Sequence, residues 1–119
     1  MEWKLTEDRP IWQQLSQQIA RQILIGVYPP GSRLPPVREL AAQAGVNPNT
    51  MQRALSQLEQ AGLAEANRTA GRLVTRDQGV IEAARRAEAR GIIRRYLESM
   101  NELGYGPEEA VELLKEEKL

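Results

Sequence analysis

The chain has 119 residues, its 16 Lys/Arg balance 16 Asp/Glu, and it contains neither cysteine nor histidine. The two absences exclude disulfides, thiol nucleophiles, imidazole bases and the usual zinc sites, so we expect no catalytic residue, no metal and no cofactor. A chain of this length buries one small core with room for a helical appendage, and two full domains with separate pockets are not expected.

The charges are divided unevenly along the chain. Residues 1–76 hold 9 Lys/Arg against 6 Asp/Glu, whereas residues 77–119 hold 7 against 10. This asymmetry favours a first part that faces phosphate and a second part that faces water or a partner. No apolar run approaches the roughly 18 residues of a membrane span, and no charged-then-apolar leader is seen, so we expect a soluble cytoplasmic protein of bacterial type without a membrane partner.

A first helix is predicted over about residues 10–25. Gly26 ends it, and residues 28–31 (Tyr-Pro-Pro-Gly) form a rigid turn. Residues 1–9 alternate apolar Trp3 and Leu5, which predicts a short strand or an arm that packs on a partner. The apolar positions of the helix recur every four residues on one side: Ile11, Leu15, Ile19 and Ile23.

Residues 34–63 predict two short helices joined through Gly45. Apolar residues at 37, 40, 41 and 44 give the first helix one buried face, and Gly45 supplies the left-handed conformation that ends it. Asn47 is the expected N-cap of the second helix, Pro48 suits its first position, and Gly62 ends it. So short a turn makes the helices cross steeply, as in a helix-turn-helix. The second buried stripe is Met51, Ala54, Leu55 and Leu58.

The opposite face of that second helix is polar and free of acids. Uncharged amides and hydroxyls with one arginine are the groups that a helix in the DNA major groove uses on base edges and phosphates. A merely solvated polar face is the alternative interpretation. The residues of this face are Asn49, Thr50, Gln52, Arg53, Ser56 and Gln57.

The rest of the chain predicts a hairpin and then two helices. Residues 63–66 and 72–75 have strand-like length around a turn at 67–71, the arrangement of a wing. From Gln78 a long amphipathic helix is expected, interrupted or tolerated at Gly91, and Pro107 opens a final helix after a glycine-rich turn.

These two helices cannot enclose a core alone, so a homodimer is expected to cover their apolar stripe. The alternative is a monomer in which the long helix packs across the first helix. The residues expected to make the dimer contact are Ile81, Ala84, Ile92, Tyr96, Leu97 and Met100.

Several stretches together resemble the GntR family of bacterial transcription regulators. They are PIWQQLSQQI and GVYPPGSRLPPVRELAAQAGVNPNTMQRALSQLEQAGL, and the tail ARRAEARGIIRRYLESMNELGYGPEEAVELLKEE resembles the two-helix appendage of the YtrA subgroup. The resemblance implies a mainly α fold with a small β-hairpin: a winged helix-turn-helix over 1–76 and a two-helix dimerisation or effector appendage over 77–119. It also implies a palindromic operator.

The resemblance carries DNA contacts onto Arg38 in the VREL motif and onto the turn and front of the second helix of the motif. One departure concerns the wing, whose tip lacks the glycine usual in the family. Arg68 and Arg72 are then expected to grip phosphates from outside the minor groove. The contacts expected at the turn and helix are Asn47, Asn49, Thr50, Gln52 and Arg53.

Each of these candidate DNA contacts also has a simpler interpretation. Arg38 could pair with Glu39, and Gln52 and Arg53 could touch the DNA backbone instead of adenine and guanine. Asn47 can serve both as a cap and as a phosphate contact. The arginines at 85, 86, 90, 94 and 95 are expected to form a solvated face paired with glutamates rather than a second nucleic-acid patch.

The functional hypothesis is a sequence-specific transcription regulator, a repressor, that binds double-stranded DNA at an inverted repeat as a homodimer. A winged helix used only for protein contacts is the main alternative. An RNA binder needs exposed aromatics, and an enzyme needs a paired general base, so neither is favoured. A small-molecule effector is unidentified; its site would form between subunits or against the first helix.

Overall fold

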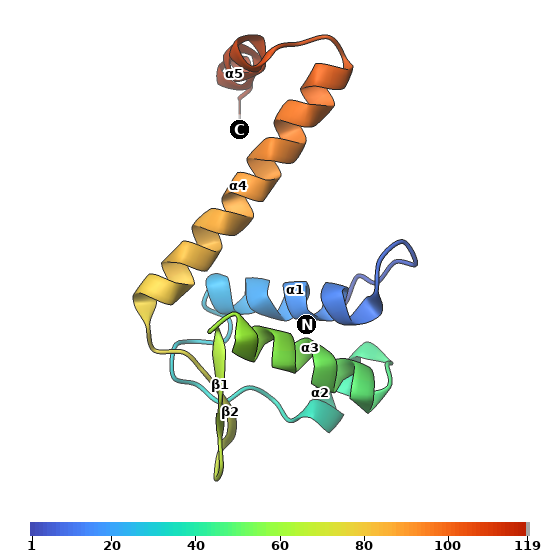
Figure 1. Cartoon of the computed structure of the whole chain (residues 1–119), viewed down its shortest axis with the longest axis vertical. Helices are drawn as coiled ribbons and strands as arrows, with labels where there is room; N and C mark the ends of the chain where they lie inside the picture. Colours follow the sequence, from blue (N-terminus) through green and yellow to red (C-terminus); the bar gives the residue numbers. More distant parts are fainter. Residues whose placement is uncertain (119) are drawn as a thin grey trace. The chain divides into compact units, whose positions relative to one another are not determined.

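The computed structural model describes residues 1–118 and shows a mainly helical chain with one small hairpin (Figure 1). This confirms the fold class predicted from the sequence. The elements are α1 (Ile11–Leu24), α2 (Val37–Ala44), α3 (Pro48–Gln60), β1 (Ala64–Asn67), β2 (Gly71–Val74), α4 (Gln78–Glu102) and α5 (Pro107–Glu116).

The chain forms two compact units that divide inside α4. The first comprises Met1–Ala83 and the second begins at Ala84. Composition places the division after residue 76, two residues before α4 begins. The helix is continuous through Gly91, so this glycine is tolerated rather than a point of interruption.

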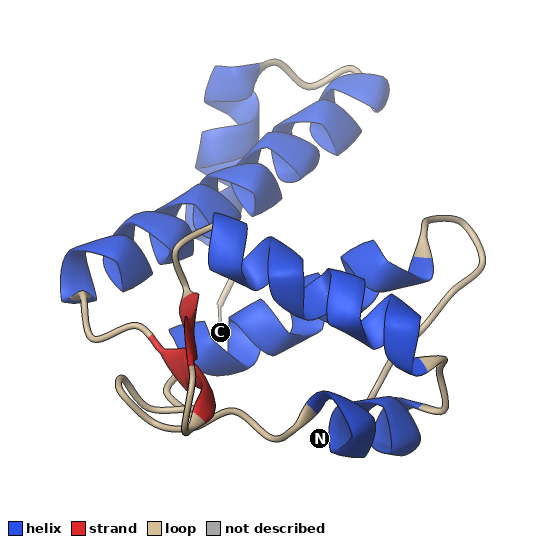
Figure 2. Ribbon diagram, turned by 60° about the horizontal axis from the view of Figure 1, so that its bottom comes forward, coloured by secondary structure: helices blue, strands red, loops and turns tan. Residues whose placement is uncertain are grey.

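The core of the first unit lies around α3, which packs against α1, α2 and β1 (Figure 2). The predicted apolar stripes are confirmed, because their central residues are 0–2% exposed. Burial of this kind contributes about 1.5–3 kcal/mol per large apolar side chain and is the main force holding the unit together. The residues at the centre of the core are Leu15, Ile19, Ile23, Leu40, Met51, Ala54, Leu55 and Leu58.

The turn between α2 and α3 follows the predicted pattern. Gly45 has φ +69°, and the next amide, that of Val46, donates to the Ala41 carbonyl over 3.0 Å. This closes the end of α2 in the manner of a Schellman motif. The Asn47 side chain then accepts a hydrogen bond from the Asn49 amide over 2.7 Å, which caps α3 at its start.

A feature that the sequence did not suggest is a third extended segment beside the hairpin. Residues 31–34 bond β2 antiparallel: the Leu34 amide donates to the Arg72 carbonyl over 2.9 Å, and the Val74 amide donates to the Ser32 carbonyl over 2.8 Å. Thr75, by contrast, donates to Leu63 on the β1 side. Alternate residues along one strand bond opposite neighbours, so residues 31–34 lie on the free edge of β2.

The wing tip is closed by Asn67 and Gly71. Residues 68–70 contain no glycine, as noted from the sequence, and the Asn67 side chain accepts hydrogen bonds from the amides of Thr69 and Ala70 over 3.0 and 2.9 Å. Gly71 has φ +79° where β2 begins. The left-handed residue that the reversal needs therefore stands at the end of the turn instead of at its tip.

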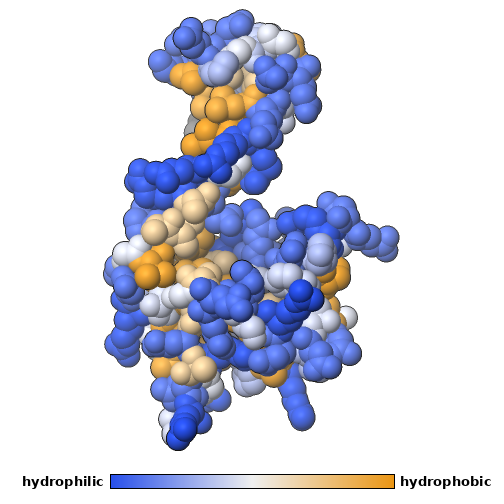
Figure 3. Space-filling model, in the orientation of Figure 1, coloured by the Kyte–Doolittle hydropathy of each residue, from blue (hydrophilic) through white to orange (hydrophobic). Residues whose placement is uncertain are grey.

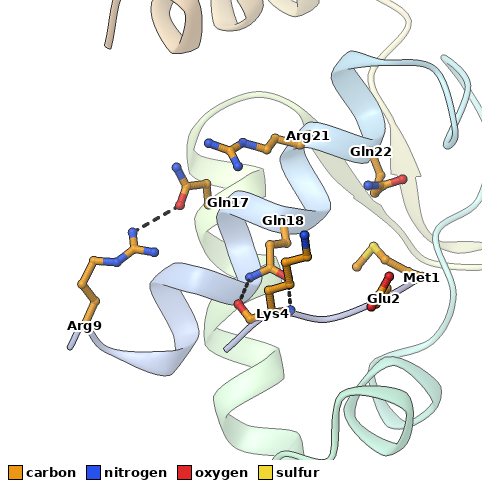
Figure 4. Close-up of a pocket in the computed structure, with 8 residues that line it drawn as sticks. All are labelled: Met1, Glu2, Lys4, Arg9, Gln17, Gln18, Arg21 and Gln22. Atoms are coloured by element: carbon orange, nitrogen blue, oxygen red, sulfur yellow. Dashed lines mark hydrogen bonds between the residues drawn. The ribbon is translucent and has the colours of Figure 1, made fainter. Parts of the chain in front are cut away.

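The strand considered for residues 1–9 is wrong. The backbone of this arm pairs with glutamine side chains of α1: Gln18 exchanges two hydrogen bonds with Lys4, over 3.0 and 2.6 Å (Figure 4). Gln14, 1% exposed, accepts from the Thr6 amide and donates to the carbonyls of Thr6 and Arg9, each over 2.8 Å. A buried amide satisfied in this way fixes the arm without a strand partner.

In the second unit, α5 packs on the later half of α4. Ala110 is fully buried, and the Tyr96 hydroxyl donates to its carbonyl over 2.6 Å. Glu109 reaches back to the Gly106 amide and caps the start of α5.

The apolar residues of α4 do not form one stripe along its whole length, which corrects the expectation of a single amphipathic face. At 100° per residue, most of those before Gly91 and most of those after it project from roughly opposite sides. The first set is Val80, Ala84 and Ala87, the second is Ile93, Tyr96, Leu97 and Met100, and Ile81 and Ile92 lie between the two. When the apolar periodicity is analysed over both sets at once, the two directions of the apolar face are averaged. The change from one side of the helix to the other is then not visible in the sequence.

Two glycine substitutions should have opposite effects on stability. A Cβ added to Gly45 meets nothing within 4 Å, so Gly45→Ala should cost only the left-handed conformation, about 1–2 kcal/mol. Gly91 is helical, and its added Cβ would meet Arg95 at an ordinary 3.5 Å, so Gly91→Ala should stabilise α4 by about 0.5–1 kcal/mol. Urea unfolding of both variants measures the difference, and a shift in the same direction for both would contradict it.

Candidate nucleic-acid interface

The polar face of α3 is exposed in the first unit. Asn49, Gln52 and Arg53 are exposed, and Thr50 is half-buried at the border of the apolar stripe. The only acid of the helix, Glu59, lies in its last turn. The face therefore offers amides, a hydroxyl and one guanidinium without a nearby carboxylate that would repel phosphate.

Arg38 and Asn47 stand beside this face. Arg38 is exposed in the first turn of α2, and within residues 1–118 it forms no ion pair with Glu39. Asn47 uses its carbonyl oxygen as the cap, which leaves its NH₂ group for a phosphate.

The Tyr28 phenol lies near Glu39. Burial, and to a smaller extent the charge of Glu39, raises the pKa of this phenol above its ordinary value.

Arg53 has a partner that was not expected. Its guanidinium carbon lies 4.2 Å from the centroid of the Trp12 ring, so the cation is stacked on an indole that projects from the first turn of α1. Trp12 is half-buried and Arg53 is exposed. The interaction ties the single cation of α3 to the neighbouring helix.

The two arginines of the wing differ. Arg68 is exposed at the tip, whereas the Arg72 Nε donates to a Glu59 carboxylate oxygen over 2.5 Å, with the side chains 19% and 30% exposed. This pair joins β2 to the end of α3. Arg72 thus helps to hold the wing against the helix, and Arg68 is the wing arginine with its guanidinium in solvent.

Sequence reasoning missed three residues of this surface. Trp12 and Glu59 could not be matched to Arg53 and Arg72, because their pairings join elements far apart in the chain. Arg33 is exposed on the edge segment 31–34, its Nε 3.9 Å from where a Cβ on Gly71 would lie. A hollow of about 320 Å³ opens beside it, lined partly by Leu34, Arg33 and Arg72. The alternation Ser-Arg-Leu after the proline turn was the signal that could have revealed Arg33.

The residues expected at a dimer contact lie in different surroundings. Ile81 is 4% exposed and belongs to the first unit, so burial in its own chain removes it from that set. Ile92 is 54% exposed, and Ile93, which the sequence reasoning did not select, is equally exposed. The other four are half-buried: Ala84, Tyr96, Leu97 and Met100.

A polar hollow of about 480 Å³ lies against α1, the helix that sequence reasoning considered for an effector site (Figure 4). Its lining includes the cationic side chains of Lys4, Arg9 and Arg21, the acid Glu2, and the amides of Gln17 and Gln22. Elsewhere in residues 1–118, no group of three or more acidic side chains is placed to hold a metal ion. None of the helices over the same residues is both long and apolar enough to cross a bilayer.

Comparison with known proteins agrees with this geometry. The model of the family described as bacterial regulatory proteins, gntR family, matches residues 12–74. The HTH-type transcriptional regulator YhcF of Bacillus subtilis is 32% identical over 97% of this chain and 95% of its own length. A GntR family transcriptional regulator from Listeria monocytogenes superposes with a TM-score of 0.86 at 31% identity, over 96% of this chain and all of that one.

YtrA-type regulators are also among the similar proteins. The HTH-type transcriptional repressor YtrA of Bacillus subtilis is 41% identical over 56% of this chain and 51% of its own length. The resemblance to the YtrA subgroup seen in the sequence is therefore confirmed. The chain belongs to the GntR family of bacterial regulatory proteins, a family of DNA-binding transcription regulators rather than enzymes.

Proposed function

We propose that the protein is a repressor that binds an inverted-repeat operator as a homodimer and reads bases with the exposed face of α3. The observation that carries the proposal is that face itself, where Asn49, Gln52 and Arg53 are exposed without a neighbouring acid. Arginine and glutamine at such positions make bidentate bonds to guanine and adenine. Asn47, Thr50 and Arg38 lie within the same helix-turn-helix, and we assign them to the phosphates that flank the bases.

Arg68 is assigned to the phosphate backbone because it lies at the wing tip. Phosphate contacts fix the register of a protein on the duplex and carry no sequence information. Arg72 is assigned a smaller share of that contact, since Glu59 already neutralises much of its charge. Arg33 adds a further cation on the same edge of the sheet.

A homodimer is supported by the second unit, in which large apolar side chains stay exposed. Ile92 and Ile93 on α4 are each 54% exposed, and Val111 and Leu114 on α5 are 45% and 59% exposed. Hydrophobic surface is visible among the hydrophilic residues in the upper part of Figure 3. Exposed apolar surface gathered on one small unit is typical of a protein interface. A second copy covers it symmetrically without requiring any other partner.

The charges beside these apolar residues suit such a pairing. Arg90 and Arg95 border the exposed isoleucines of α4, whereas Glu108 borders Val111 on α5, where Glu112 pairs with Lys115 over 3.4 Å. When α5 of one copy lies on α4 of the other, charges of opposite sign meet around the apolar contact. Complementary borders of this kind set the register of an interface more than its affinity.

Two-fold symmetry then places one α3 in each half-site, with centres about 34–36 Å apart on the duplex. Occupancy of such a site excludes RNA polymerase, and the similar Bacillus subtilis protein YtrA is named a repressor. We place the protein in the bacterial cytoplasm, where its DNA target lies. The hollow against α1 is the candidate position for an unidentified effector, and a lining with three cationic side chains against one acid, Glu2, favours an anionic one.

Selection from a randomised duplex pool at moderate salt tests the whole proposal. Enrichment of an inverted repeat is the expected result. Weak binding without enrichment, lost as the salt concentration rises, would instead favour a winged helix used for protein contacts. Enrichment of a single half-site without its inverted copy would support sequence-specific DNA binding and contradict binding as a dimer.

Two arginine variants separate base reading from phosphate contact. Arg53→Ala should weaken operator binding by about 1–3 kcal/mol and relax the preference for one base. Arg68→Ala should weaken operator and random DNA alike and lower the slope of log K against log salt by about 1. Fluorescence anisotropy titrations over a salt series measure both. Equal effects of the two variants on operator and random DNA would contradict the assigned roles.

A third variant tests the dimer contact. Replacing both exposed isoleucines of α4, Ile92→Glu with Ile93→Glu, should raise the dimer dissociation constant by about tenfold or more, because each copy would bury two new charges. Ile25→Glu is the matched control, since Ile25 is 71% exposed in the first unit. Analytical ultracentrifugation over a concentration series reports the constant. An unchanged monomer-dimer equilibrium in the double variant would contradict this interface.

A further inference from the structure

We infer that Trp12 is a positioning residue of the DNA-reading surface: its indole holds the guanidinium of Arg53 in the orientation that reads a base. The inference rests on the proposed function, in which Arg53 contacts a base edge. It assigns to α1, a helix outside the helix-turn-helix, a direct part in sequence discrimination.

The stacking geometry leaves the reading groups of Arg53 available. The guanidinium carbon lies 4.2 Å from the ring centroid, the distance of a cation over an aromatic face. A guanidinium that lies over a ring by its flat side keeps its N–H donors in its own plane, directed away from the ring. A bidentate bond to guanine uses that in-plane edge. The same arginine can therefore stack on Trp12 and bind a base at once.

No competing anion holds Arg53. Within residues 1–118 it forms no ion pair, and the only acid of α3, Glu59, is bound to Arg72. An exposed arginine without such a partner samples many rotamers, and fixing one of them opposes binding. The indole restricts the side chain before DNA arrives, so less conformational entropy is lost in the complex.

The helix that carries the indole is held in place by the core. Trp12 precedes by one helical turn Leu15 and Ser16, which are 0% and 7% exposed, and α1 packs along α3. The backbone at Trp12 cannot shift relative to α3 without displacing these buried neighbours. The position of the guanidinium is thus tied to the same packing that orients the recognition helix.

Removing the aromatic face while keeping apolar bulk tests the inference. Trp12→Leu should weaken operator binding by about two- to fivefold, the factor that corresponds to an exposed cation-π contact, and leave random-DNA binding unchanged. Trp12→Phe retains a weaker aromatic face and should recover part of the loss. In an Arg53→Ala background, Trp12→Leu should have no further effect, because its role passes through the guanidinium. Anisotropy titrations of Trp12→Leu, Trp12→Phe, Arg53→Ala and the Trp12→Leu/Arg53→Ala double variant measure these effects.

The outcomes separate this inference from the proposed function. If Arg53→Ala affects operator and random DNA equally, base reading by Arg53 fails whatever Trp12 does. If Arg53→Ala costs specificity but Trp12→Leu costs nothing, or adds to it independently, Arg53 reads DNA without help from Trp12. Tighter operator binding by Trp12→Leu would mean that the indole withholds the cation from DNA, which overturns the inference.

A readout without DNA checks the stacking itself. The chain has two tryptophans, so Trp3→Phe leaves Trp12 as the only one. Arg53→Ala in this background should shift the emission of Trp12 in the free protein, whereas Arg68→Ala at the distant wing tip should not. Unchanged emission with Arg53→Ala would show that the stack does not form in solution. Matching thermal melts of all variants exclude unfolding as the cause.

Discussion

The burial of one face of α3 is the constraint on which the rest of the first unit depends. Met51, Ala54, Leu55 and Leu58 are each no more than 1% exposed, and α1, α2 and β1 all pack on the helix that carries them. Because a helix that buries one side must show the other, the same packing presents Asn49, Gln52 and Arg53 to solvent. The orientation of α3 about its own axis therefore decides both which residues form the core and which polar residues face solvent, where the proposed function places DNA. A change that turned this helix would damage both together.

The wing is fixed to this core by contacts at both edges of β2. On one edge residues 31–34 add backbone hydrogen bonds, and on the other β1 continues from the end of α3. The Arg72–Glu59 pair then joins the β2 surface to the last turn of α3. A partly buried charge pair of this kind contributes little net stability but penalises other arrangements of the wing. The wing tip with Arg68 is consequently held at a defined place relative to the recognition helix.

The elements of this fold were predictable from the sequence because each depends on neighbours within about four residues. The Gly45 reversal, the Asn47 cap and the two buried stripes follow from local spacing and capping chemistry, and the structure confirms them. The pairing of residues 31–34 with β2, and of the arm with Gln14 and Gln18, joins segments distant in sequence. Such pairings leave no periodic signal, so the sequence left residues 1–9 open between a strand and an arm, and the edge segment was missed.

The candidate site divides in the same way. Exposure of the polar face of α3 was predictable from periodicity, whereas the partners of its charged groups were not. Arg53 and Arg72 were both expected to contact DNA, yet one lies over the Trp12 ring and the other is bound to Glu59. The difference matters because an indole leaves the charge and the donors of a guanidinium available, while a carboxylate neutralises the charge and occupies donors. The tertiary fold thus leaves the guanidinium of Arg53 available for the role proposed for it and ties that of Arg72 to α3, through contacts between elements that the sequence pattern does not reveal.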